Sequence, residues 1–87
     1  MSEDINSIDG GTTLVSAIEQ ATPVQVDTLW SILKYKEIGI LRKVKCMSDV
    51  LHLNSNNVIQ ELPTDPKGRL LDYKTRHIIH DTLIKVS

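Results

Sequence analysis

The chain has 87 residues, enough for one domain with a thin hydrophobic core. Its 40% hydrophobic content and net charge of −1 are typical of a globular domain, and its three aromatic residues argue against a protein that stacks single-stranded bases on aromatic rings. The lone cysteine, Cys46, excludes an intrachain disulfide, and no apolar stretch is long enough to cross a membrane. We therefore expect a cytoplasmic protein, or a nuclear one in a eukaryote, that does not act at a membrane.

The charges divide unevenly along the chain. Residues 1–27 hold five acidic residues and no basic one, whereas residues 28–87 hold ten basic residues against six acidic ones. Residues 1–12, MSEDINSIDGGT, are acidic and contain two glycines, which predicts a flexible acidic arm. A single helical domain over residues 13–87 should follow, and its basic balance indicates a polyanion or an acidic protein as partner.

The first helix predicted after the arm spans residues 12–21, TTLVSAIEQA. Thr12 or Thr13 can cap its N-terminus, because a hydroxyl there accepts a hydrogen bond from a free backbone N–H. The apolar residues that then share one helix face are Leu14, Ala17, Ile18 and Ala21.

The clearest helix signal covers residues 22–39, TPVQVDTLWSILKYKEIG. Thr22 suits the cap, Pro23 the first turn and Gly39 the end of the helix. One stripe at helical spacing contains Val26, Leu29, Trp30 and Leu33. Ile32 and Tyr35 lie off that stripe, which suggests that a second surface of this helix is also covered.

A third helix is predicted over residues 40–53, almost without a loop before it. Its apolar stripe contains Ile40, Val44, Met47 and Leu51. Ser55 can then cap a short helix over residues 56–62, which ends before Pro63.

The last third of the chain begins with a turn and then becomes ambiguous. Residues 65–68, DPKG, fit a type I turn, with Asp first, Pro second and Gly fourth. Residues 69–86 fit one long helix with a face of Leu71, Thr75, Ile78, Thr82 and Val86. Their Ile, Thr and Val content also fits strands, which would make the fold a winged helix. We favour the helix, and with it a small all-α bundle of four to five helices.

Residues 47–62, MSDVLHLNSNNVIQEL, resemble a generic helix–turn–helix motif. Met47 and Leu51 would be buried positions of its first helix, Leu53 the turn anchor, and Val58 the contact of its second helix. Two residues depart from the pattern: His52 replaces the glycine common in the turn, and Glu61 stands where an aliphatic residue is usually buried.

The resemblance implies a DNA-binding regulator that reads duplex DNA through the second helix. Asn56, Asn57 and Gln60 would face the bases, since amide side chains pair bidentately with adenine. The phosphate contacts would come from Arg42, Lys43, Lys45, Lys67 and Arg69. The second helix has no Lys or Arg, however, and phosphate neutralisation supplies most of the affinity in such complexes. Two helices that only pack together remain the alternative.

The function we favour is a small non-enzymatic protein-interaction module, such as an adaptor, inhibitor or assembly subunit, with DNA binding as the alternative. The surface around Trp30, Ile32 and Tyr35 would take a protein partner or a second copy of the chain, because Trp and Tyr are frequent interface anchors. We expect no cofactor and no small-molecule substrate. We also expect no metal, because the only candidate ligands, Cys46, His52, His77 and His80, do not have the close-paired spacing of zinc sites.

Overall fold

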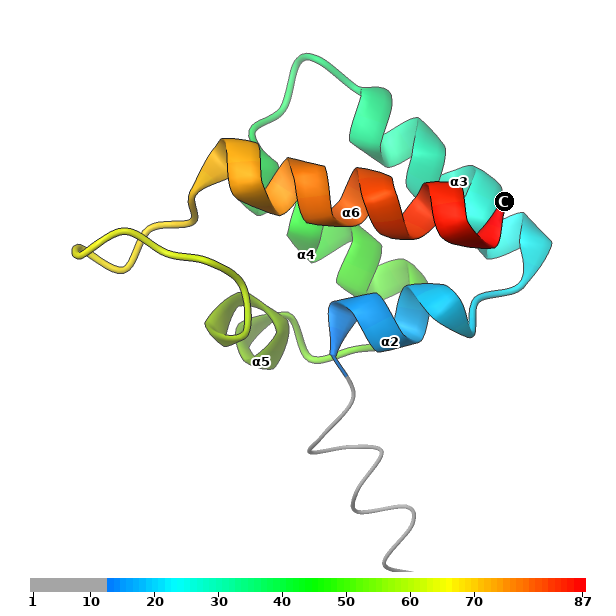
Figure 1. Ribbon diagram of the computed structural model, residues 1–87, viewed down its shortest axis with the longest axis horizontal. Coiled ribbons are helices and arrows are strands. Elements are labelled where there is room, and N and C mark those ends of the chain that lie inside the picture. The colour runs from blue at the N-terminus through cyan, green and yellow to red at the C-terminus, as the bar shows by residue number, and fades with distance from the viewer. Residues whose placement is uncertain (1–12) are drawn as a thin grey trace, which may run out of the picture.

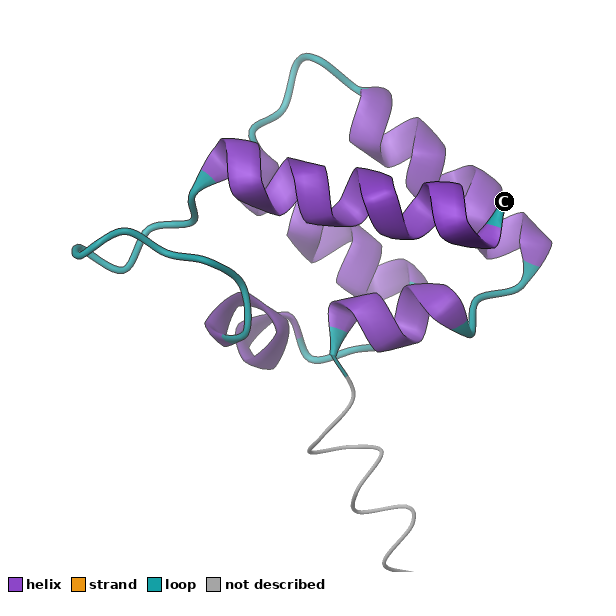
Figure 2. Cartoon of the chain, viewed as in Figure 1, coloured by secondary structure: helices purple, strands orange, loops and turns teal. Residues whose placement is uncertain are grey.

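The computed structural model describes residues 13–87, and the predicted acidic arm lies outside the described residues. Within the described part the chain forms five helices and no strand (Figures 1 and 2). Their bounds are α2 Leu14–Glu19, α3 Pro23–Lys34, α4 Ile40–Val50, α5 Ser55–Gln60 and α6 Asp72–Val86. The predicted all-α bundle is thus confirmed, and the winged-helix alternative is not needed.

The C-terminal helix α6 is the central element of the bundle. It packs against α2, α3 and α4, while α4 also packs against α3 and α5 (Figure 1). The shared core is almost wholly aliphatic and contains Leu14, Ile18, Val26, Leu29, Leu33, Ile40, Val44, Met47, Val58, Leu62, Ile79 and Leu83. No helix in residues 13–87 combines the length and the apolar character that a membrane crossing would require.

Helix α6 buries a different stripe from the one predicted. Thr75 and Thr82 are buried as expected, but Ile79 and Leu83 form the centre of the stripe and Ile78 lies at its edge. The hydroxyl of Thr82 donates to the carbonyl of Ile78 at 2.8 Å, which satisfies one buried threonine inside a helix. The packing of this stripe against three helices overrides the strand preference of the Ile, Thr and Val residues.

Helix α3 begins as predicted but ends earlier. Thr22 caps it in a reciprocal arrangement with Gln25, in which each side chain accepts a hydrogen bond from the other residue's backbone N–H. The helix ends at Lys34, and Gly39 does not stop it but precedes α4 as its N-cap. At this end a buried lysine takes the place of a further helical turn as donor, since Lys43 Nζ donates to the carbonyl of Leu33 at 2.8 Å.

The turn between α4 and α5 has the hydrogen bonds of a Schellman motif. Helix α4 ends at Val50, three residues before the predicted bound, and the backbone N–H groups of His52 and Leu53 donate to the carbonyls of Asp49 and Ser48. His52 has a φ of 59°, the left-handed conformation that glycine adopts with least strain. His52, which replaces the glycine common in helix–turn–helix motifs, therefore adopts the backbone conformation that glycine would have at this position.

Two further local predictions concern the ends of loops. Asn54, rather than Ser55, caps α5, because its Oδ1 accepts a hydrogen bond from Asn56 N at 3.0 Å. The turn at residues 65–68 is confirmed by a hydrogen bond from Gly68 N to Asp65 O at 2.9 Å. Gly68 has a φ of 82°, and an isolated bridge between Thr64 and Leu70 closes the turn.

Candidate functional site

An apolar groove of about 780 Å³ lies between α3 and α6. We call it the aromatic groove, and its lining residues are Trp30, Leu33, Lys34, Asp72, Tyr73, Arg76, His77 and His80. Trp30 is partly buried and packs against the core, whereas Tyr73 is 70% exposed. One aromatic side chain therefore forms a fixed wall of the groove, and the other stands open to solvent.

The position of Trp30 is fixed by one contact from its own helix and one from α6. Lys34 Nζ lies over the indole ring, 5.4 Å from its centroid, at the distance of a cation–π contact. The His80 ring meets the indole with centroids 5.4 Å apart and planes 89° apart, an edge-to-face arrangement. The indole is thus held between two side chains that are both hydrophilic.

The α6 side of the groove is one helix face. Tyr73, Arg76, His77 and His80 follow each other at i, i+3, i+4 and i+7, which places them in one row. Arg76 Nη2 pairs with Asp72 Oδ1 at 3.0 Å, and His77 Nε2 lies 3.0 Å from Asp81 Oδ2. These pairs are solvent-exposed and orient the side chains more than they stabilise the fold.

A second hollow of about 580 Å³ continues the groove past the end of α3. We call it the cationic hollow, since its lining consists of Leu33 and four basic residues, Lys34, Lys36, Lys43 and Arg76. Lys43 is only 3% exposed. Burial lowers the pKa of its ammonium, the positive charge of Arg76 lowers this pKa further, and Asp72 partly opposes both effects.

The three residues predicted to bind a partner do not form one surface. Trp30 lines the aromatic groove, but Ile32 lies two positions along α3 and therefore about 200° around its axis, on the other flank. Tyr35 is 52% exposed just beyond the end of α3. The face on α6 was missed, although the i, i+3, i+4, i+7 spacing of Tyr73, Arg76, His77 and His80 is visible in the sequence.

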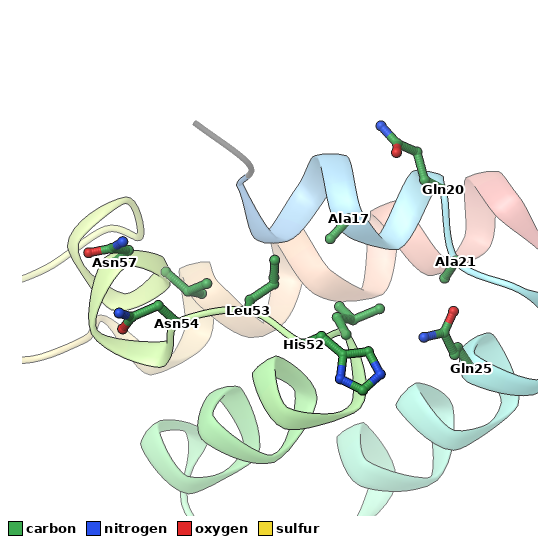
Figure 3. A pocket seen from close by; sticks show the side chains of 10 residues that line it. Ala17, Gln20, Ala21, Gln25, His52, Leu53, Asn54 and Asn57 are labelled. Carbon is green, nitrogen blue, oxygen red and sulfur yellow. The ribbon is translucent and has the colours of Figure 1, made fainter. Parts of the chain in front are cut away.

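A separate hollow of about 650 Å³ lies where the α4–α5 turn meets α2 and α3. Its floor is apolar, with Ala17, Ala21, Leu51, Leu53 and Val58, and its rim has no charged side chain apart from the titratable His52. Figure 3 shows Asn54 and Asn57 at its α5 end, Gln25 at the opposite end and His52 on the turn between them. Gln25 is already engaged, because its Nε2 donates to the carbonyl of Val50 at 3.1 Å.

The residues predicted to contact DNA are distributed over three elements. Arg42 and Lys45 are exposed on α4, Asn56, Asn57 and Gln60 on α5, and Lys67 and Arg69 in the turn before α6. Lys43 is buried at the end of α3 instead, so its ammonium does not join an exposed phosphate-binding row. Asn57 lines the hollow beside α2, and Arg69 Nε pairs with Asp65 Oδ2 at 3.3 Å.

The candidate metal ligands do not converge. Over residues 13–87 no group of three or more His, Cys, Asp or Glu side chains is arranged to hold an ion.

The chain matches no family model, no curated protein and no solved structure. The features that bear on its function are therefore the aromatic groove, the cationic hollow and the α4–α5 turn.

Proposed function

We propose that this chain is a non-enzymatic protein-interaction module that binds its partner in the aromatic groove. The observation that carries the proposal is the open, largely apolar groove in which Trp30 is fixed and Tyr73 is exposed. Interfaces draw most of their binding energy from a few such aromatic residues seated in pockets. Tyr73 is not part of the hydrophobic core, so its ring is free to contact a partner.

The surroundings of the groove support an interface better than a reaction site. Its lining contains no Ser, Thr or Cys that could serve as a nucleophile, and both of its histidines lie within 4 Å of the exposed Asp81 carboxylate. Further along the same face of α6, Ile84 is 55% exposed and extends the apolar surface. A polar rim around aromatic and aliphatic anchors is the usual composition of a protein–protein contact.

A photo-crosslinker placed in the groove tests this proposal in the full chain. Tyr73 is replaced by p-benzoylphenylalanine, and a matched chain carries the same group at Val24, which is 75% exposed on α3 outside the groove. Irradiation in cells should yield a discrete adduct from position 73 and none from position 24, with mass spectrometry identifying the second protein. A covalent dimer would identify self-association as the interaction. Equal adducts from both positions, or none from position 73, would remove the proposal.

DNA binding through α4 and α5 is the second candidate, and the Schellman turn at His52 is the observation in its favour. It gives residues 47–62 the sharp break between helices that the helix–turn–helix resemblance implies. The burial of Lys43 and the lack of any Lys or Arg on α5 weaken this candidate. A gel shift at about 50 mM salt tests it: Arg42→Ala and Lys45→Ala should weaken binding to all duplexes alike, and no shift of any duplex would exclude DNA.

A further inference from the structure

We propose that the cationic hollow is a carboxylate-binding site, and that the partner is an acidic peptide segment with an apolar anchor. The anchor would lie against Trp30 and Tyr73 in the aromatic groove, while its neighbouring carboxylates would enter the hollow. This inference rests on the proposed function, because it identifies the chemistry of the partner that the groove receives.

The first argument is the concentration of unbalanced charge. Four of the five residues that line the hollow are basic, and they come from α3, the loop after it, α4 and α6. Among residues 13–87, the one acidic group that the structure pairs with them is Asp72, which binds Arg76. Like charges brought together from separate elements repel each other, so a bound anion would stabilise the arrangement.

The second argument is the unused hydrogen-bonding capacity of a buried group. The Lys43 ammonium has three N–H donors, and within residues 13–87 its one recorded hydrogen bond is to the carbonyl of Leu33. Burial makes an unmet donor costly, and the lowered pKa of Lys43 reflects this environment. A carboxylate in the hollow would accept from the remaining donors and offset the repulsion from Arg76.

The third argument concerns the class of partner. The cationic hollow and the aromatic groove share Leu33, Lys34 and Arg76, so one ligand can contact both. A nucleic acid would also supply anions, but its bases stack along several open aromatic faces, and Tyr73 is the one well-exposed aromatic ring in the lining of the groove. Lys34 already covers one face of the Trp30 ring, and His80 adds an edge-to-face contact. An aliphatic or aromatic side chain followed by acidic residues fits this surface better than a stack of bases.

Isothermal titration calorimetry with defined peptides tests the inference on the full chain. The probe is a capped peptide in which leucine and phenylalanine are flanked by pairs of glutamates, and its matched control has glutamine at every glutamate position. The acidic peptide should bind at least about tenfold more tightly than the control at low salt, because opposite charges across an interface discriminate between partners. Added salt should reduce this difference.

Substitutions in the chain locate the effect. Lys34→Gln and Arg76→Gln should each weaken binding of the acidic peptide about three- to tenfold. Asp72→Asn should strengthen it, since it removes the carboxylate that competes for Arg76. Lys74→Gln is the matched control, because Lys74 is an exposed lysine of α6 that lines neither the hollow nor the groove and should have no effect. Circular dichroism verifies that each variant folds.

The outcomes separate this inference from the proposed function. If the glutamine peptide binds as tightly as the acidic one, the carboxylate site is excluded while the apolar groove still binds peptide. If neither peptide binds, the inference fails, and the crosslink from position 73 decides the proposed function independently. Tighter binding of an oligothymidylate than of the acidic peptide, lost in Lys34→Gln, would replace the peptide with a nucleic acid and overturn the inference.

Discussion

The α3–α6 pair and the α4–α5 pair differ in how firmly the fold holds them. Helix α6 has 15 residues, buries Thr75, Ile79, Thr82 and Leu83, and packs against three helices. Helix α5 has six residues, buries Val58, and packs mainly against α4. The surface on α3 and α6 is therefore built on the most extensively packed helix, and the helix–turn–helix-like motif ends in a short helix with a single main packing partner, which we expect to open more readily.

The two pairs also differ in chemistry. The hollow beside the α4–α5 turn has a rim of amide side chains and a histidine, whereas the α3–α6 side combines aromatic residues with four cations. Amides can read hydrogen-bonding groups but supply no long-range attraction. Helix α5, which would read the DNA, has no Lys or Arg, whereas four basic residues line the cationic hollow. We favour a protein partner because of this contrast.

Truncating one core residue in each pair should give the largest contrast in stability. Ile79→Ala should lower the free energy of unfolding by about 3 kcal/mol, since it leaves a cavity under the best-packed helix. Val58→Ala removes fewer atoms from a peripheral helix and should cost about 1–2 kcal/mol. Urea unfolding measures both values. Hydrogen exchange should also show faster exchange of α5 amides than of α6 amides in the unmodified chain, and equal protection would contradict the contrast.

A smaller effect is expected from the buried threonines of α6. Thr75 Oγ1 is buried and, among the described residues, finds no hydrogen-bond partner, so Thr75→Val should stabilise the fold by about 1 kcal/mol. The control is Thr82→Val, which removes the hydrogen bond from Thr82 Oγ1 to Ile78 O and should be neutral or slightly destabilising. The unfolding temperature should rise in Thr75→Val and stay unchanged or fall slightly in Thr82→Val, and a loss of stability in Thr75→Val would show that its hydroxyl is satisfied.

The turn of the α4–α5 pair should respond to relief of its backbone strain. His52→Gly should stabilise the fold by about 0.5 kcal/mol, because glycine adopts a positive φ without strain but has more conformational freedom to lose on folding. His52→Val should destabilise it by about 1–2 kcal/mol, since a β-branched residue fits this conformation poorly. Chemical denaturation ranks the three chains, and a valine variant as stable as the original would disprove the role given to this turn.

The smallest expected effect is a pH dependence at the turn before α6. Hydrogen bonds from the backbone N–H groups of Arg69 and Lys67, together with the Arg69 charge, lower the pKa of Asp65 below its usual 3.8. The ionised carboxylate therefore contributes stability above pH 3.8, and this contribution is lost as the pH falls through the lowered pKa. Asp65→Asn keeps an acceptor for both N–H groups but loses the charge. The Asp65→Asn chain should therefore be less stable than the original chain at about pH 5, and the free energies of unfolding of the two chains should converge toward about pH 2.

The sequence predicted the helices well where local signals agree. The Thr22–Pro23 start, the apolar stripe of α4 and the turn at residues 65–68 all depend on short-range geometry, and all three appear in the structure. The end of α3 could not be predicted in this way. There the carbonyl of Leu33 accepts a hydrogen bond from the ammonium of Lys43, a residue of the next helix.

The candidate site was harder to predict, because its residues come from helices far apart in the chain. Lys43 lies three residues after Ile40 and four before Met47, so its position on the buried stripe was available from the spacing. The basic residues around Lys43 instead favoured the prediction that its side chain is exposed and contacts phosphate. Trp30 was named as part of the predicted partner surface, but only the packing of α6 against α3 shows that Tyr73 and Arg76 lie beside it.

The placement of Trp30 gives the molecule an intrinsic optical probe. It is the one tryptophan of the chain, and it contacts both a lysine and a histidine inside the aromatic groove. The fluorescence of the unlabelled protein should thus report the arrival of a ligand in the groove, without any chemical modification.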